Sequence, residues 1–172
     1  GFDPQEVRDA ASSILERIYS KESEFNDQLV NAAEAIRTAK ELSQKTTRPV
    51  IIADPQDNPG AGASGDSTGL LSQLIQSKVP ALVGMFWDPN AANQCHTVGL
   101  GKTITIDIGG KFPRENGPAL TITGVIKSLS DGKFLCKGPY SLGVNANLGK
   151  MAAVHIRLDT QSEIIILLGS NR

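Results

Sequence analysis

The sequence has little of what metal and redox centres need, because its 172 residues include two cysteines and two histidines. Cys95 and Cys136 do not form a CxxC pair, and no HExxH motif occurs. A zinc ion takes about three or four protein ligands, so His96 and His155 are too few to predict a complete metal site. A disulfide between the two cysteines stays open as an alternative, but free thiols in a reducing compartment are favoured.

Long apolar runs and an excess of charge are also missing. The longest continuous apolar run is residues 164–168, far shorter than the ~20 residues that cross a bilayer. The formal net charge is −1, which gives no sign of binding to nucleic acid or to an anionic membrane. We see no signal-peptide pattern and no N-glycosylation sequon, and we expect a cytoplasmic location. The first residue is Gly1 rather than methionine, so we expect a fragment or a processed chain.

Motifs of nucleophilic and phosphate chemistry are not found either. No serine lies in a GxSxG elbow. Residues 99–103 match the end of a phosphate-binding P-loop, but His96 stands where that motif requires its first glycine. Asp54, Asp57 and Asn58 do not follow the spacing of a calcium-binding loop. None of these motifs therefore supports a complete catalytic or metal-binding site in this chain.

What is present indicates one globular domain that begins with two helices. The residues are 40% hydrophobic and 20% charged, as in ordinary globular domains. Asp3 and Pro4 begin a first helix over about residues 3–19, which we expect to bury one apolar stripe. Asn31 begins a second helix, which should end near Ser43.

The stretch that organises the prediction is residues 49–71. Residues 50–53 form a short apolar run typical of a buried strand. The loop that follows, residues 54–65, holds three glycines and two prolines, and Asp66 is expected to cap a third helix. Ligands bind at the carboxyl ends of strands in α/β sheets, and helix N-termini favour anions. The loop is also longer than the usual ~2–6 residues of such connections, so we predict the functional site here.

The rest of the chain predicts a mixed α/β (α+β) fold. A strand at residues 81–87 would complete a βαβ unit with the strand before the loop. Asp88 and Pro89 cap the next helix, and Gly99 ends it. Alternating β-branched residues then predict a mostly antiparallel half, with strands at 103–108, 119–129, 134–137, 152–158 and 163–168. We expect a single domain over residues 1–172, with a seam between two lobes near residue 100 as the alternative.

Three blocks of motifs follow one another along the chain. The first is Asp57-Asn58-Pro59-Gly60-Ala61-Gly62 followed by Gly65-Asp66-Ser67-Thr68. The second combines Asp88-Pro89, Cys95-His96, Gly99-Leu100-Gly101 and Ile108-Gly109-Gly110-Lys111. The third is Leu129-Ser130-Asp131-Gly132-Lys133-Phe134, with Gly138-Pro139 and Leu148-Gly149. In this order, over about residues 25–170, they resemble the carboxyl-terminal domain of the microcystinase C family of metallopeptidases.

The resemblance implies an enzyme built from two parts. Family members bind zinc through histidine and carboxylate ligands on a larger amino-terminal domain, and they hydrolyse amide bonds in small peptides. That domain is expected to be absent here, so the zinc ligands would lie outside this chain and the isolated chain would be inactive. The implied partners are a small peptide substrate and the metal-binding domain. Nucleic acid and membranes are not expected as partners, and a homo-oligomer is left open.

Within the Gly-rich loop, the resemblance implies contacts to substrate or to the surroundings of a metal-bound water. Asp57 would accept a proton or orient that water, and Asn58 would donate to a developing oxyanion. These two are the predicted catalytic residues. The predicted substrate-binding residues are Asp54, Gly60, Gly62 and Asp66. Of these, the glycines would allow a close backbone approach, and Asp66 is expected mainly to cap its helix.

Two hypotheses from other classes stay open. The first is an independent small-molecule or anion-binding module that uses residues 54–66. The second, weaker one is a subunit-contact domain, since the β-rich half could expose a sheet edge. A histidine-bearing domain encoded directly upstream would favour the peptidase hypothesis.

Overall fold

The computed structural model describes residues 3–25, 29–112, 117–157, 159 and 162–171. The chain divides into two compact units, residues 1–31 and residues 32–172, and each is described by itself. None of the helices in the described ranges combines the length and the apolar character that a bilayer crossing requires.

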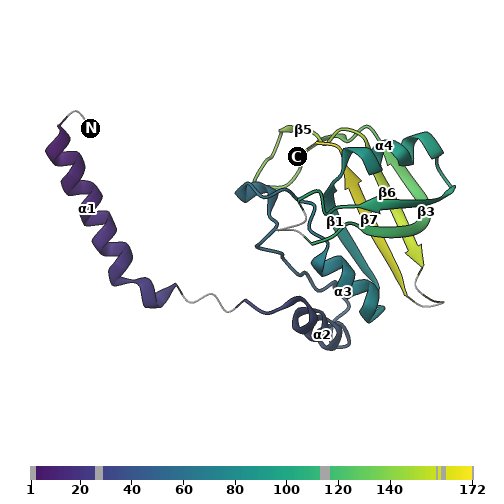
Figure 1. The fold of residues 1–172 in the computed structure, drawn as a ribbon, viewed down its shortest axis with the longest axis horizontal. Coiled ribbons are helices and arrows are strands. Elements are labelled where there is room, and N and C mark those ends of the chain that lie inside the picture. The colour runs from purple at the N-terminus through teal and green to yellow at the C-terminus, as the bar shows by residue number, and fades with distance from the viewer. Residues whose placement is uncertain (1–2, 26–28, 113–116, 158, 160–161, 172) are drawn as a thin grey trace. The chain divides into compact units, whose positions relative to one another are not determined.

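The first unit contains α1 (Pro4–Ser20) and a short 3₁₀ helix, η1 (Glu22–Glu24) (Figure 1). The predicted start of α1 is confirmed. The Asp3 carboxylate accepts hydrogen bonds from the backbone N–H groups of Gln5 and Glu6, at 2.7 and 3.2 Å. Pro4 takes the first helical position, where its missing N–H costs nothing.

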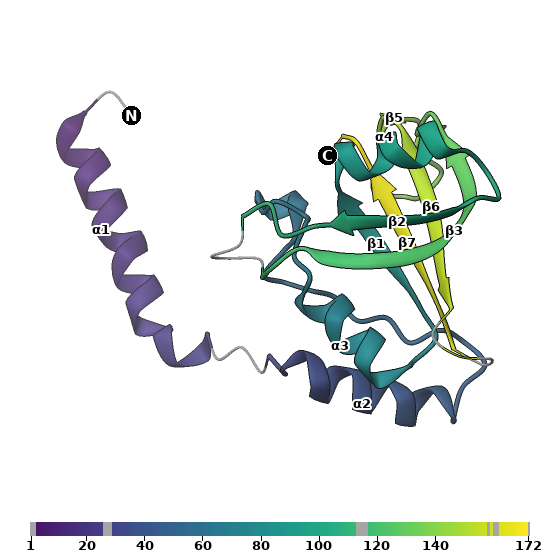
Figure 2. The same ribbon diagram turned by 45° about the vertical axis from the view of Figure 1, so that its right-hand side comes forward.

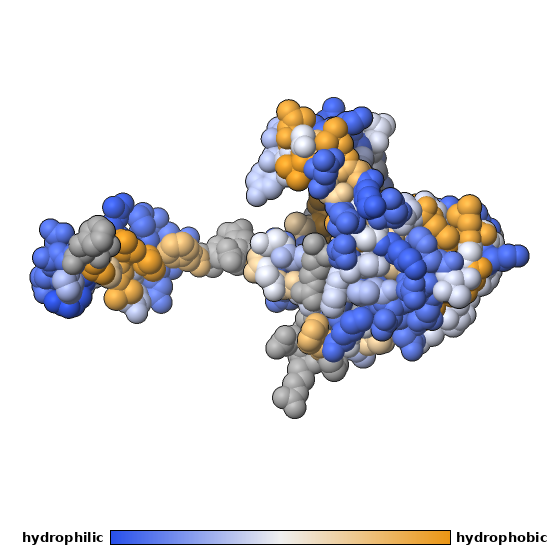
Figure 3. Space-filling model, turned by 90° about the horizontal axis from the view of Figure 1, so that it is seen from above, coloured by the Kyte–Doolittle hydropathy of each residue, from blue (hydrophilic) through white to orange (hydrophobic). Residues whose placement is uncertain are grey.

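The predicted burial of the apolar stripe on α1 is wrong, because no residue of this helix is buried. Val7, Ile14, Leu15 and Ile18 keep 46–60% of their surface exposed, and Figure 3 shows apolar side chains on the surface of this helix. The apolar side of a helix becomes buried only against a second layer of structure. The first unit contains no such layer among its described residues.

The second unit is built on a five-stranded sheet with the strand order β1-β7-β6-β3-β2. Its strands are β1 (Ala81–Trp87), β2 (Thr103–Ile108), β3 (Leu120–Ser130), β6 (Met151–Arg157) and β7 (Glu163–Gly169). β1 and β7 run parallel, and the other neighbouring strands of this sheet run antiparallel. A separate two-stranded hairpin joins β4 (Lys133–Leu135) to β5 (Asn145–Asn147). The predicted mixed α+β class with a mostly antiparallel sheet is confirmed.

The predicted βαβ unit is not formed, and that part of the prediction is wrong. Residues 50–53 form no strand, and Ile51 is 87% exposed. The parallel neighbour of β1 is instead β7, from the far end of the chain. The physical reason lies in the two sequences: β7 offers a longer apolar run, whereas residues 50–53 stand between Pro49 and Pro55, which cannot donate to a ladder.

Among its described residues, this unit has three α-helices: α2 (Ala32–Ser43), α3 (Gly69–Ser77) and α4 (Pro89–Val98). α2 and α3 pack against each other, and Figures 1 and 2 show them side by side with α4 at the opposite end of the body. The end of α2 at Ser43 and both ends of α4 confirm the predictions. Asp88 caps α4 through a 3.0 Å bond from the N–H of Ala91.

The core of this unit is rich in isoleucine because the strands alternate between an inner and an outer face. In β2 every second residue is buried, and β6 and β7 follow the same rule. Helical side chains complete the core. Its buried members include Leu71, Leu74, Cys95, Ile104, Ile106, Ile108, Ile122, Ile126, Val154, Ile164, Ile166 and Leu168. This packing sets the carboxyl ends of β1 and β7 at one edge of the body, where the Gly-rich loop lies.

Candidate functional site

The Gly-rich loop is attached to the carboxyl ends of the two parallel strands. The backbone N–H of Trp87, the last residue of β1, donates to the carbonyl oxygen of Gly65 at 2.8 Å. The next residue, Asp88, donates its N–H to the carbonyl of Gly169 at the end of β7, at 3.0 Å. The Trp87 indole N–H reaches the carbonyl of Ser170 at 3.1 Å. The loop therefore lies where ligands bind in α/β sheets. The strands that place it there are β1 and β7, not the predicted strand at residues 50–53.

Asp57 closes this loop on itself. Its Oδ1 accepts hydrogen bonds from the N–H of Gly65 at 2.7 Å and from the hydroxyl of Ser64 at 3.4 Å. Its Oδ2 accepts from the N–H of Ser67 at 2.6 Å. Such charge-assisted bonds are among the stronger ones in proteins. Asp57 is half-buried in the loop. A carboxylate has about four acceptor positions, so after these three hydrogen bonds Asp57 can still accept a further proton donor.

Two of the exposed polar side chains of the loop, Asn58 and Asp54, are held in turn conformations. Asn58 caps a short 3₁₀ helix, η2 (Pro59–Ala61), by accepting the Gly60 N–H at 2.9 Å through its Oδ1. Asp54 accepts the N–H of Gln56 at 3.0 Å, an Asx turn. The Asn58 oxygen already accepts this bond, and its NH₂ group, which points away from that bond in the amide, can donate to a ligand.

Gly60 and Gly62, the two glycines predicted to bind substrate, differ in the reason for which glycine suits each position. Gly62 has φ +94°, a left-handed conformation, and no heavy atom of the described chain lies within 4 Å of a Cβ built there. A ligand can therefore approach its backbone closely. At Gly60 a Cβ would lie 3.2 Å from the Oδ1 of Asn58, and the Gly60 N–H is already used by that oxygen.

The predicted helix cap at Asp66 is wrong. α3 begins at Gly69, with Thr68 as its N-cap residue. Asp66 is instead fully buried, where its Oδ2 accepts the backbone N–H of Lys111 at 2.7 Å and its Oδ1 accepts the hydroxyl of Ser64. The physical reason is that the distant N–H of Lys111 takes the carboxylate, which would otherwise accept an N–H group at the start of the helix. The substrate contact predicted for Asp66 stays a prediction, and its burial favours a structural role.

Asp88 and Lys111 belong to this site, although the sequence predicted only a helix cap for the first and no role for the second. Asp88 is 1% exposed, and its Oδ2 accepts the N–H of Gly109 at 3.2 Å and forms an ion pair with the ammonium of Lys111. A signal was present in the sequence: two glycines followed by lysine at the end of a strand allow the backbone to turn tightly against a neighbour.

Gly109 carries the tightest approach between this turn and the loop, and its replacement is a test of that contact. Its φ is +64°, and a Cβ there would lie 2.5 Å from the carbonyl oxygen of Asp66. We expect Gly109→Ala to lower the free energy of unfolding by ~3 kcal/mol or more, measured by urea denaturation. Gly138→Ala is the matched control, since a Cβ there meets no described atom within 4 Å. Equal stability of the two variants would contradict the contact.

Cys95 gives the fold a pH dependence that can be measured. It is fully buried in α4, and burial, together with the carboxylate of Asp88, raises the pKa of its thiol. The folded state therefore keeps a proton that the unfolded state releases above about pH 8.5. We expect the free energy of unfolding to fall as pH rises above that value, and Cys95→Ala to flatten this part of the curve. Parallel curves for the parent and Cys95→Ala would refute the assignment.

Within the described ranges, no group of three or more His, Cys, Asp or Glu side chains could hold a metal ion. His96 contacts the carbonyl oxygen of Met151 through Nε2 at 3.0 Å, and His155 pairs with Glu163. The described residues therefore do not fit a complete zinc site.

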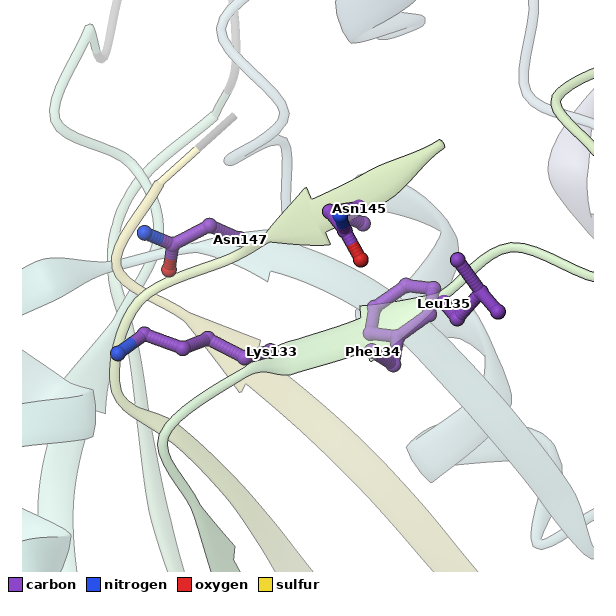
Figure 4. A pocket seen from close by; sticks show the side chains of 6 residues that line it. Lys133, Phe134, Leu135, Asn145 and Asn147 are labelled. Atoms are coloured by element: carbon purple, nitrogen blue, oxygen red, sulfur yellow. The ribbon is translucent and has the colours of Figure 1, made fainter. Parts of the chain in front are cut away.

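A hollow of about 350 Å³ lies beside the β4–β5 hairpin (Figure 4). It is lined by Lys133, Phe134, Leu135, Asn145, Ala146 and Asn147. Five of these six residues are exposed, so the hollow is open to solvent and has one charged side chain. Ligand sites are usually concave, with a few convergent polar groups. The loop around Asp57 has those polar groups, and we take it as the candidate site.

Comparison with solved structures finds a protein with a similar fold. The chain is similar to the crystal structure of a "Putative metallopeptidase" from Mesorhizobium sp. BNC1, with a TM-score of 0.77 and 20% sequence identity. The similarity covers 95% of this chain and 31% of that one, and at this identity it shows the fold alone.

The sequence comparisons identify the family. Over 87 residues the chain is 38% identical to microcystinase C from Sphingomonas sp., which covers 50% of this chain and 17% of that protein. The family model described as MlrC C-terminus matches residues 52–172. The chain belongs to this family, and the resemblance seen in the sequence is confirmed. It spans less than a third of the solved relative and aligns with less than a fifth of the curated one.

Proposed function

We propose that this chain is the carboxyl-terminal, active-site-completing part of a zinc-dependent peptidase that acts on small peptides. The observation that carries the proposal is the Asp57 loop, held at the carboxyl ends of β1 and β7 with an exposed amide at Asn58. Membership of the MlrC C-terminus family supports it, as does the similarity to microcystinase C. The zinc ligands are proposed to lie on a part of the protein outside this chain.

The chain's own residues would bind and orient the peptide. Asp57 has acceptor capacity left after its three hydrogen bonds, so it can accept a proton or orient a nucleophile. The NH₂ of Asn58 can donate to an oxyanion that develops at the scissile carbonyl. The open backbone at Gly62 admits the peptide close to the loop, and the exposed carboxylate of Asp54 lies three residues before Asp57.

The hydrogen bonds of the loop disfavour the alternative, an anion-binding module. An anion would need free backbone N–H groups, as in a P-loop. Here these groups already donate to Asn58, Pro59 or Asp57 in six places: Gly60, Ala61, Gly62, Ala63, Gly65 and Ser67. Asp57 thus occupies the position that a bound anion would take, and the peptidase proposal fits the loop better.

The proposal is tested by Asn58→Ala in a form of the protein extended upstream that hydrolyses peptides. The loss of one oxyanion donor should lower kcat/KM by about tenfold or more, mainly through kcat. Gln76→Ala, which removes an exposed amide from the surface of α3, is the matched control and should keep the parental rate. Unchanged kinetics in both Asn58→Ala and an Asp57 variant would remove these residues from the site.

A further inference from the structure

We propose that Lys111 is a positioning residue for Asp57, and that it acts through two buried carboxylates on either side of it, Asp66 and Asp88. Lys111 bonds one of them with its backbone and the other with its side chain. This inference rests on the proposed function of the Asp57 loop. Lys111 lies in the turn after β2, and this position along the chain gives no reason to expect that it acts on the Asp57 loop.

The first link joins the backbone of the turn to Asp66. The N–H of Lys111 donates to the Oδ2 of Asp66 at 2.7 Å, and the N–H of Gly110 donates to the Asp66 carbonyl at 2.9 Å. Asp66 is fully buried, so a lost partner would not readily be replaced by water. The turn therefore fixes both the side chain and the main chain of residue 66.

The second link joins residue 66 to Asp57. The residues on either side of Asp66 donate their N–H groups to Asp57, Gly65 to Oδ1 at 2.7 Å and Ser67 to Oδ2 at 2.6 Å. A shift of residue 66 must move both donors. The orientation of the Asp57 carboxylate thus depends on where the turn holds Asp66.

The third link is the ion pair between Lys111 and Asp88. Asp88 is 1% exposed and follows β1 directly, whereas the Lys111 side chain is 29% exposed. Removing the ammonium leaves the buried Asp88 carboxylate without its counter-charge, which is unfavourable away from water. The ammonium therefore holds the turn against the end of β1. At the same strand end, the N–H of Trp87 holds the carbonyl of Gly65.

Together the three links make Lys111 a second point, beside the bond from Trp87 to Gly65, at which the loop and the strand end are tied to one another. Its backbone bonds the loop, and its side chain bonds the strand end. Loss of the ammonium should free the turn, loosen the N–H donors of Gly65 and Ser67, and leave Asp57 in several orientations. An effect of this kind lowers kcat more than it raises KM, because Asp57 acts in the transition state.

The test is amide hydrogen exchange in the 172-residue chain, which needs no enzyme activity. In Lys111→Met, which keeps the apolar stem and removes the charge, the Gly65 and Ser67 amides should exchange at least about tenfold faster than in the parent. Amides in the centre of β7 should keep their rates. Lys111→Arg should restore slow exchange. Lys133→Met, which breaks an exposed ion pair with Asp131, should change neither amide.

Asp88→Asn is the second variant, and it removes the same ion pair from the other side. It must also speed exchange of Gly65 and Ser67, so the inference stays testable if Lys111→Met does not fold. Parental exchange of both amides in either folded variant overturns the inference, even where the melting temperature has fallen. If the exchange responds as expected but no extended form of the protein hydrolyses peptides, Lys111 still positions Asp57 and the proposed function fails.

Discussion

Asp57→Asn is expected to lower kcat/KM for peptide hydrolysis about a hundredfold in a form of the protein extended upstream. The substitution removes the charge and replaces one acceptor oxygen by an NH₂ group. That NH₂ would face the N–H of Gly65 or of Ser67, both of which now donate to the carboxylate. The loop loses a donor–acceptor match and the site loses its proton acceptor. Steady-state kinetics over a range of peptide concentrations measures both effects.

The matched control for this experiment is Asp131→Asn. Asp131 is also a loop aspartate that accepts a nearby backbone N–H, that of Lys133 at 3.2 Å, but its side chain is exposed and lies at the β4–β5 hairpin. We expect parental kinetics for this variant. If Asp57→Asn matches it, the proposed catalytic role of Asp57 is refuted, whatever the change in stability.

Asp88→Ala is expected to be the most destabilising substitution of a single side chain in the site, by about 3–5 kcal/mol in the free energy of unfolding. The Asp88 carboxylate receives the N–H groups of Ala91 and Gly109 and the ammonium of Lys111. The N–H groups of Ala91 and Gly109 would lose a partner at buried positions, and the ammonium of Lys111, whose side chain is 29% exposed, would lose its ion pair. Urea denaturation of the 172-residue chain measures the loss.

Two further variants separate the causes of that loss. Asp107→Ala removes an exposed carboxylate from β2, one that accepts the hydroxyl of Thr121 at 2.6 Å, and should cost less than about 1 kcal/mol. The double variant Asp88→Ala/Lys111→Met should lose less than the sum of its single changes, because the second change removes the charge that the first leaves unpaired. Strict additivity would contradict a direct pairing of the two side chains.

Local signals in the sequence predicted the helices well. α4 begins and ends as predicted because Asp88, Pro89 and Gly99 act within a few residues of the helix ends. Strands β2, β3, β4, β6 and β7 were also predicted, but β5 was not. Alternation of buried and exposed residues, as in β2 and β6, is a property of each strand by itself.

Contacts between distant segments explain the errors. Residues 50–53 carry the composition of a strand, but the sheet position beside β1 is taken by β7, which lies more than 100 residues beyond residues 50–53 along the chain. Asp66 is followed by residues that suit a helix, but its carboxylate is bonded by Lys111, 45 residues further on. Long-range pairing of this kind leaves no periodic trace in the local sequence.

The candidate site was predicted in part. The loop lies at the carboxyl ends of two parallel strands, as predicted. The pair is β1 and β7, however, whereas the prediction paired residues 50–53 with residues 81–87. The roles of Asp57 and Asn58 remain predictions. Lys111 and its pairing with Asp88 could not be derived, because a single lysine after two glycines does not show which buried carboxylate it will meet.

The central claim is that this chain completes an active site whose metal ligands lie elsewhere in the protein. The most direct test is to measure zinc content and peptide hydrolysis, side by side, for the 172-residue chain and for a form extended upstream. We predict stoichiometric zinc and hydrolysis in the extended form and neither in the short one. Stoichiometric zinc in the short chain, or an extended form with neither zinc nor activity, would contradict the claim.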